Sequence, residues 1–179
     1  EVVTLDLLSL GRVTLGVGSG VDTGGELSRL DEVVDPRTRG ARLDEGLRVL
    51  ARLFEGETVA HIGEHYTVDG VALEPRPAQM PRPPIWCAAR GSALKPVRRA
   101  ARYDGVFPIE VDADTFRRAL DEIEAVRGDL DGFDVCLRTT VEGEVPPFAE
   151  EGATWLLRDF PAVADPDTVF DAVVHGPPG

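Results

Sequence analysis

Two short segments have the residue types of ligand-binding loops, and the first is Gly16-Val17-Gly18-Ser19-Gly20, which follows the apolar run 13–15. Glycine allows a backbone either to turn tightly or to approach a flat ligand closely. The segment therefore predicts a tight turn or a strand end beside such a ligand. Val21 stands where the dinucleotide-binding fingerprint G-x-G-x-x-G requires its third glycine, which argues against a nicotinamide site.

The second segment, Ala88-Ala89-Arg90-Gly91-Ser92, joins a predicted strand to a predicted helix. Pro96 lacks an N–H group and is expected near the first position of that helix. The amides of Gly91 and Ser92 would then lie free at a helix N-terminus, where backbone donors and the helix dipole favour a phosphate. Arg90 could add a charge-assisted contact. The alternative is an ordinary capped loop between strand and helix.

The segment His61-Ile62-Gly63-Glu64-His65 matches the zinc-peptidase pattern H-x-x-E-H, which works only on a helix. Gly63 interrupts it, and its neighbours Val59 and Tyr66 favour strand, so we expect a hairpin turn and no metal site. No G-x-S-x-G segment indicates a serine hydrolase.

Composition excludes several classes of function. The chain has 179 residues, 42% of them hydrophobic and 28% charged, which is typical of one globular domain. A net charge of −13 makes a nucleic-acid partner unexpected. No apolar run approaches the roughly 18 residues of a membrane span, so we expect a cytoplasmic protein without a membrane partner. Cys87 and Cys136 are isolated and are expected to be buried, reduced thiols.

The elements that must position these segments follow from the apolar periodicity. A helix is predicted over 2–8, a second helix from Pro36 to Gly56 with Asp35 as its N-cap, and a hairpin of 58–60 against 65–68. The proline-rich stretch 74–84 is expected to be extended. Strands are predicted over 12–17, 85–89, 105–109, 135–141 and 153–157, with helices after the second, third and fifth of them. This α/β alternation predicts a parallel sheet covered by helices, either open and doubly wound or part of a barrel.

Six segments carry a resemblance to a known family. They are 5–18 (LDLLSLGRVTLGVG), 35–45 (DPRTRGARLDE), 63–66 (GEHY), 83–86 (PPIW), 99–108 (RAARYDGVFP) and 152–155 (GATW). In this order and spacing the chain resembles the luciferase-like flavin monooxygenase family, including its branch that uses the deazaflavin coenzyme F420. The resemblance implies a partial TIM (β/α)8 barrel, with about strands four to eight and a small hairpin insertion. It also implies that 1–179 is a single domain, the C-terminal portion of a barrel, with an insertion at about 21–83.

The resemblance also implies a function: hydride transfer or monooxygenation of a small-molecule substrate with F420 or FMN as cofactor. Gly18, Ser19 and Gly20 would lie beside the cofactor ring, and the residues of 88–92 would hold its phosphate: Ala88, Ala89, Arg90, Gly91 and Ser92. Val21 stands where the sugar-phosphate dehydrogenases of the F420 branch carry a glutamate proton donor. We therefore name no catalytic residue.

The alternative to an enzyme is a truncated, non-catalytic homologue that acts as a self-associating or cofactor-binding scaffold. A partial barrel leaves two open sheet edges, and open edges favour pairing with a second chain. On either interpretation a homodimer is expected.

Overall fold

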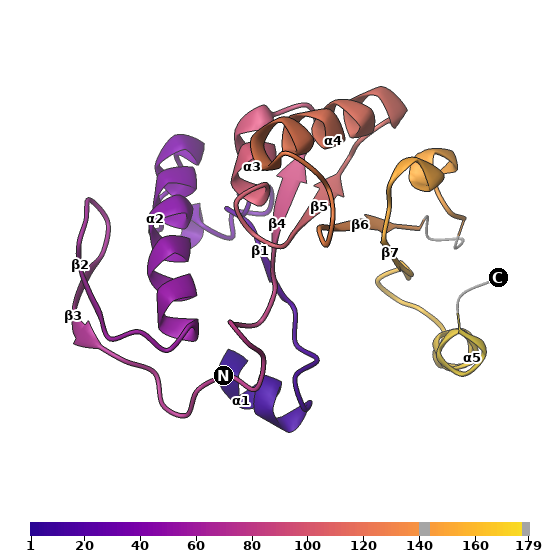
Figure 1. The fold of residues 1–179 in the computed structure, drawn as a ribbon. Helices are drawn as coiled ribbons and strands as arrows, with labels where there is room; N and C mark the ends of the chain where they lie inside the picture. The colour runs from indigo at the N-terminus through magenta and orange to yellow at the C-terminus, as the bar shows by residue number, and fades with distance from the viewer. Residues whose placement is uncertain (140–143, 177–179) are drawn as a thin grey trace. The chain divides into compact units, whose positions relative to one another are not determined.

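A computed structural model describes residues 1–139 and 144–176. The chain divides into two compact units, residues 1–88 and the residues from Ala89 onward, and each is described by itself. Figure 1 labels the helices and strands of both units. All strand pairs in the five-stranded sheet for which a register is defined are parallel.

The first unit begins with helix α1 (Val2–Leu8) and strand β1 (Leu15–Val17), and continues through helix α2 (Pro36–Phe54) and a two-stranded hairpin, β2 (Val59–Ile62) and β3 (Thr67–Val71). Strand β4 (Ile85–Arg90) starts in this unit, where it pairs in parallel with β1. A short 3-10 turn, η1 (Ser28–Leu30), lies in the stretch predicted as loop. The first strand is shorter than the predicted 12–17 because the Val13 carbonyl accepts a hydrogen bond from the Gln79 side chain at 2.7 Å.

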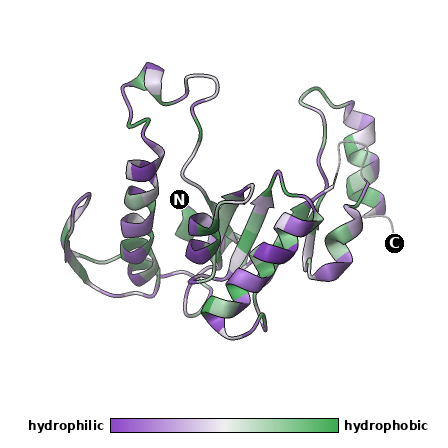
Figure 2. Cartoon of the chain, turned by 90° about the horizontal axis from the view of Figure 1, so that it is seen from above, coloured by the Kyte–Doolittle hydropathy of each residue, from purple (hydrophilic) through white to green (hydrophobic). Residues whose placement is uncertain are grey.

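Helix α2 has the predicted N-terminus. Asp35 accepts the backbone N–H of Thr38 at 2.7 Å, and Pro36 occupies the first helical position, where its missing N–H costs nothing. Among its apolar residues, Leu47, Val49 and Phe54 are buried in the core. Figure 2 shows hydrophobic and hydrophilic residues alternating around the helices, as amphipathic helices require.

A buried carboxylate fixes the segment that leads into β4. Asp6, fully buried on α1, accepts the backbone N–H groups of Ala78 and Gln79 at 2.7 and 3.1 Å and the Gln79 side-chain amide at 2.7 Å. Burial by itself would raise the pKa of Asp6, but these hydrogen bonds outweigh it and hold the pKa below its ordinary value. Asp6 therefore ties α1 to the proline-rich stretch directly before β4.

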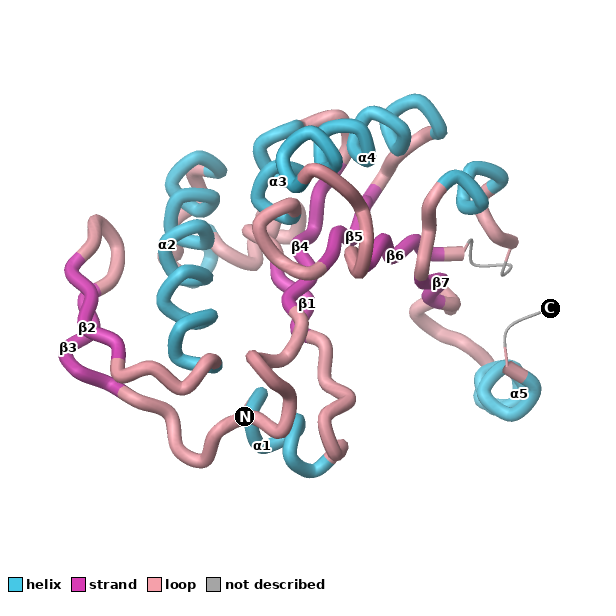
Figure 3. The backbone as a smooth tube through the Cα atoms, viewed as in Figure 1, coloured by secondary structure: helices cyan, strands magenta, loops and turns pink. Residues whose placement is uncertain are grey.

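The second unit alternates strands and helices (Figure 3). The helices are α3 (Leu94–Ala100), α4 (Ala113–Arg127) and α5 (Pro166–His175), with a 3-10 turn η2 (Pro147–Glu151); the strands are β5 (Gly105–Ile109), β6 (Asp134–Arg138) and β7 (Trp155–Leu157). The core contains Val106, Phe116, Ile123 and Val135. Asp112 caps α4 by accepting the Thr115 N–H at 2.8 Å.

The elements of the second unit match the predictions closely, with local differences. Strand β5 has the predicted bounds, whereas β6 and β7 are shorter than predicted; residues 140 and 141 of the predicted strand 135–141 lie outside the described residues. Pro96 is the third residue of α3 and not the first. Burial and the nearby Asp134 raise the pKa of Cys136 to about 11, so this buried thiol stays protonated at neutral pH.

The five-stranded sheet has the order β1-β4-β5-β6-β7. Strands that are adjacent in this order and connected through helices are typical of a barrel segment, because a doubly wound sheet reverses its order at an internal strand. The predicted fold class, a partial TIM-type α/β barrel with a small hairpin insertion, is confirmed.

We expect Asp6→Ala to lower the free energy of unfolding by about 2–4 kcal/mol, because it leaves the buried donors of Ala78 and Gln79 without an acceptor. Urea denaturation followed by far-UV circular dichroism measures this. Asp69→Ala, at an exposed position on β3, is the control and should change stability by less than about 0.5 kcal/mol. Equal stability of the two variants would show that Asp6 does not anchor the unit.

Candidate functional site

In the first unit, two small residues come together where β1 ends: Gly18, which follows β1, and Ala88 of β4. The register pairs Val17 with Cys87, and the next residues along these strands are Gly18 and Ala88. A Cβ atom added to Gly18 would lie only 3.3 Å from the Ala88 Cβ, so a larger residue at position 18 would crowd the strand. Gly20 turns the chain with a φ of +71°, a conformation that favours glycine. The first predicted segment thus contains both a close approach and a turn.

In the second unit, Ala89 and Arg90 belong to strand β4, and the loop is shorter than predicted. Gly91 has a φ of +57°, and its N–H donates to the Ile109 carbonyl at 2.9 Å. The expectation that this amide lies free was therefore wrong: it continues the pairing beyond β4. Among the described residues we find no hydrogen bond from the backbone N–H of Ser92 or Ala93, which leaves these two amides as the available donors.

Arg90 is also engaged. Its guanidinium forms an ion pair with Glu110, the residue directly after β5. Glu110 has a φ of +55°, an uncommon conformation for a residue with a side chain. Arg90, which we expected to contact a phosphate, is thus paired with a carboxylate. That carboxylate follows β5, the strand next to β4 in the sheet order.

Sequence reasoning missed a set of charged residues at the ends of the second unit's strands. Arg138 ends β6, and its Nη1 lies 3.3 Å from Oδ2 of Asp159, which follows β7. The Asp159 N–H donates to the Thr139 hydroxyl at 3.1 Å. A pocket of about 170 Å³ lies between the ends of β5 and β6 and includes Glu110, Arg138 and Thr139 in its lining. The sequence does carry a local signal for these residues, since each apolar strand segment leads directly into a charged residue.

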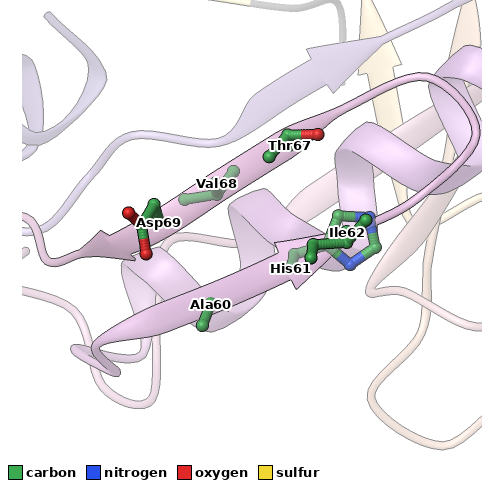
Figure 4. A pocket seen from close by; sticks show the side chains of 6 residues that line it. All are labelled: Ala60, His61, Ile62, Thr67, Val68 and Asp69. Atoms are coloured by element: carbon green, nitrogen blue, oxygen red, sulfur yellow. The ribbon is translucent and has the colours of Figure 1, made fainter.

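The H-x-x-E-H segment lies on the hairpin, as predicted. His61 belongs to β2, and Gly63 and His65 lie in the turn; Figure 4 shows His61 and Ile62 on one strand with Thr67, Val68 and Asp69 on the other, around an open pocket. The residues described here contain no group of three or more side chains that could hold a metal ion. The absence of a metal site stays a prediction.

A glutamate from α2 holds the hairpin. Glu45 accepts the N–H groups of His65 and Tyr66 at 3.0 and 2.9 Å, and lies 2.9 Å from Nε2 of His61. The hydrogen bond to His61 is the main cause that lowers the pKa of Glu45 to about 2. A Cβ on Gly63 would overlap the Glu45 carboxylate, so this turn requires glycine.

This interaction predicts a pH dependence. A carboxyl group whose pKa is lower in the folded state stabilises that state above its unfolded pKa of 4.5, and the stabilisation is lost as the pH falls from there to about 2. Hydrogen exchange of the His65 and Tyr66 amides should accelerate over this range, relative to the intrinsic rate. Glu45→Gln should show faster exchange at pH 7 and no such step. Unchanged protection in the variant would contradict the assignment.

No helix in the described ranges 1–139 and 144–176 is long and apolar enough to cross a membrane.

Comparisons with known proteins all point to one family. The family described as "Luciferase-like monooxygenase" matches residues 1–142. The oxygenase component of a flavin-dependent trigonelline monooxygenase from Acinetobacter baylyi is 33% identical over 90 residues, 50% of this chain and 24% of that protein. An uncharacterized protein of Mycobacterium tuberculosis is 33% identical over 161 residues, 87% of this chain and 52% of the relative.

Among solved structures, an F420-dependent secondary alcohol dehydrogenase in complex with an F420–acetone adduct superposes with a TM-score of 0.66 at 21% identity. The match covers 77% of this chain and 42% of the dehydrogenase. At this identity the similarity supports the fold alone. The matched segments thus cover from about a quarter to about half the length of these relatives.

Proposed function

Since the chain belongs to the luciferase-like monooxygenase family, we propose that it is an oxidoreductase that binds F420 or FMN for hydride transfer to or from a small-molecule substrate, or for its monooxygenation. The observation that carries the proposal is the close approach of Gly18, directly after β1, to Ala88 of the adjacent strand β4. Ligands of parallel α/β sheets bind at this edge.

The residues at this edge fit a flat ring system. A planar cofactor needs a surface without protruding side chains, and Gly18 and Ala88 supply hydrogen and methyl groups there. Ser19 and Gly20, which continue the turn, complete the ring side of the proposed site. When bound, the flavin or deazaflavin supplies the redox chemistry, and this chain binds and orients it.

The proposed phosphate side is the end of β4 and the turn after it. Ala88 and Ala89 have small side chains and leave room beside β4. Gly91 makes a left-handed turn, after which the amides of Ser92 and Ala93 have no hydrogen-bond partner in the described residues. Because Arg90 is paired with Glu110, the positive charge would come from Arg118 on α4. Arg118 lines a pocket of only about 10 Å³ together with Gly91, Ser92 and Thr115, so the phosphate would lie outside this pocket, where backbone donors beside a guanidinium favour it.

A second candidate is a self-associating scaffold without catalytic activity. Strands β1 and β7 stand at the two ends of the sheet order, so each has one edge without a partner strand in the described structure. Leu8 and Leu10 near β1 are 77% and 88% exposed. Both features favour association with a second copy. Light scattering combined with cofactor titration separates the candidates: a dimer that binds neither FMN nor F420 supports the scaffold.

The phosphate assignment predicts the effect of removing one donor. Ala93 has a φ of −73°, which proline adopts without strain, so Ala93→Pro removes its N–H with little backbone change. A charge-assisted hydrogen bond contributes about 1.5–3 kcal/mol. We therefore expect the affinity for FMN or F420, measured by fluorescence titration, to fall about tenfold or more.

The matched control is Ala113→Pro at the first position of α4, where proline is accepted. It should leave cofactor affinity unchanged. Equal affinities of wild type and Ala93→Pro would place the phosphate elsewhere, and the absence of binding by the wild-type chain to both cofactors would contradict the proposed function.

A further inference from the structure

The pocket between the ends of β5 and β6 is not used by the proposed cofactor site. We propose that this pocket, called here the β5–β6 pocket, binds the carboxylate group of a small organic acid through Arg138. The inference deepens the proposed function, because it names the substrate class of the same oxidoreductase, and it rests on that function for the reaction but not for the binding.

The guanidinium of Arg138 has donors available for an anion. Its one partner in the described structure is Asp159, and a single contact of 3.3 Å leaves most of the guanidinium donors unused. Asp159 is itself held, since its N–H donates to the hydroxyl of the buried Thr139. Asp159 can therefore orient Arg138 while the remaining N–H groups face a ligand. A guanidinium matches a carboxylate through two parallel hydrogen bonds.

Glu110 is the other charged residue that lines the pocket, and alone it would repel an anion. The ion pair with Arg90 offsets the charge of Glu110, just as Asp159 offsets the charge of Arg138; of the two lining residues, only Arg138 can still donate hydrogen bonds to an anion. Glu110 keeps a left-handed conformation, with a φ of +55°, which strains a residue that has a side chain. Such conformations cluster at ligand sites, where the structure around them compensates the strain.

The walls of the pocket set the rest of the ligand. Ile109, Leu137 and Phe148 are apolar and lie beside the polar end formed by Arg138 and Thr139. The volume of about 170 Å³ is well below the roughly 300–1,000 Å³ of pockets that enclose larger ligands. The apolar walls and the small volume together favour a carboxylate attached to a small apolar group, such as a single ring or a short chain, over a bulky polyanion.

Benzoate is a suitable probe, and neutral benzamide, of the same shape, is its control. In the wild-type chain without cofactor, we expect benzoate to shift the NMR amide signals of Glu110, Arg138 and Thr139 in a saturable manner. Benzamide should bind at least about tenfold more weakly. Equal binding of the two compounds would overturn the proposal without any variant. So would shifts confined to residues outside the pocket.

Arg138→Gln should weaken benzoate binding about tenfold or more, and Arg138→Lys should restore part of it, since lysine keeps the charge but not the paired donors. Arg102→Gln, at an exposed position of the same unit, is the matched control and should bind benzoate as the wild type does. Unchanged affinity in Arg138→Gln would overturn the proposal, as would inorganic phosphate binding more tightly than benzoate.

A last arm separates this inference from the cofactor assignment. Saturating FMN or F420 should leave the benzoate shifts in place if the two sites are distinct. Displacement of benzoate by either cofactor would assign the β5–β6 pocket to the cofactor and overturn the substrate proposal. A chain that binds benzoate through Arg138 but binds neither cofactor would contradict the proposed function alone.

Discussion

Parallel strands place all of their carboxyl ends at one edge of a sheet, and the residues to which this chain's chemistry is assigned lie at or just beyond such ends. Gly18 follows β1, Ala88 to Ser92 cover the end of β4 and the turn after it, Glu110 follows β5, and Arg138 ends β6. The strands themselves are short and largely apolar, so they position these residues but contribute few reactive groups. The proposed function therefore depends on the strand order of the sheet.

Two buried carboxylates hold parts of the first unit that lie outside the proposed site. Asp6 fixes the segment before β4 through buried hydrogen bonds, and Glu45 holds the hairpin through three acceptor contacts. In contrast, the Arg90–Glu110 and Arg138–Asp159 pairs are partly exposed, and exposed ion pairs add little to stability. The interactions that hold the fold and the interactions at the proposed ligand edge thus involve different residues.

Local signals predicted most of the elements. Asp35 with Pro36 gave the start of α2, and the apolar run 105–109 gave β5 with its bounds. The contacts that the sequence did not reveal join residues far apart in the chain. Nothing near Asp6 indicates Gln79 as its partner, and the use of the Gly91 amide by Ile109 depends on the pairing beyond β4. The charges after β5 and β6 were visible, but their pairing with Arg90 and Asp159 needed the strand order.

The most direct measurement of the central claim, that the carboxyl edge of the strands is the ligand edge, is a residue-by-residue map of cofactor binding on the isotope-labelled chain by NMR. With FMN or F420 added, the account predicts that the largest amide shifts fall on Gly18, Ser19, Gly20 and Ser92, and that the hairpin residues around His61 and Val68 are unaffected. Shifts centred on the hairpin pocket, or spread evenly over both units, would contradict it.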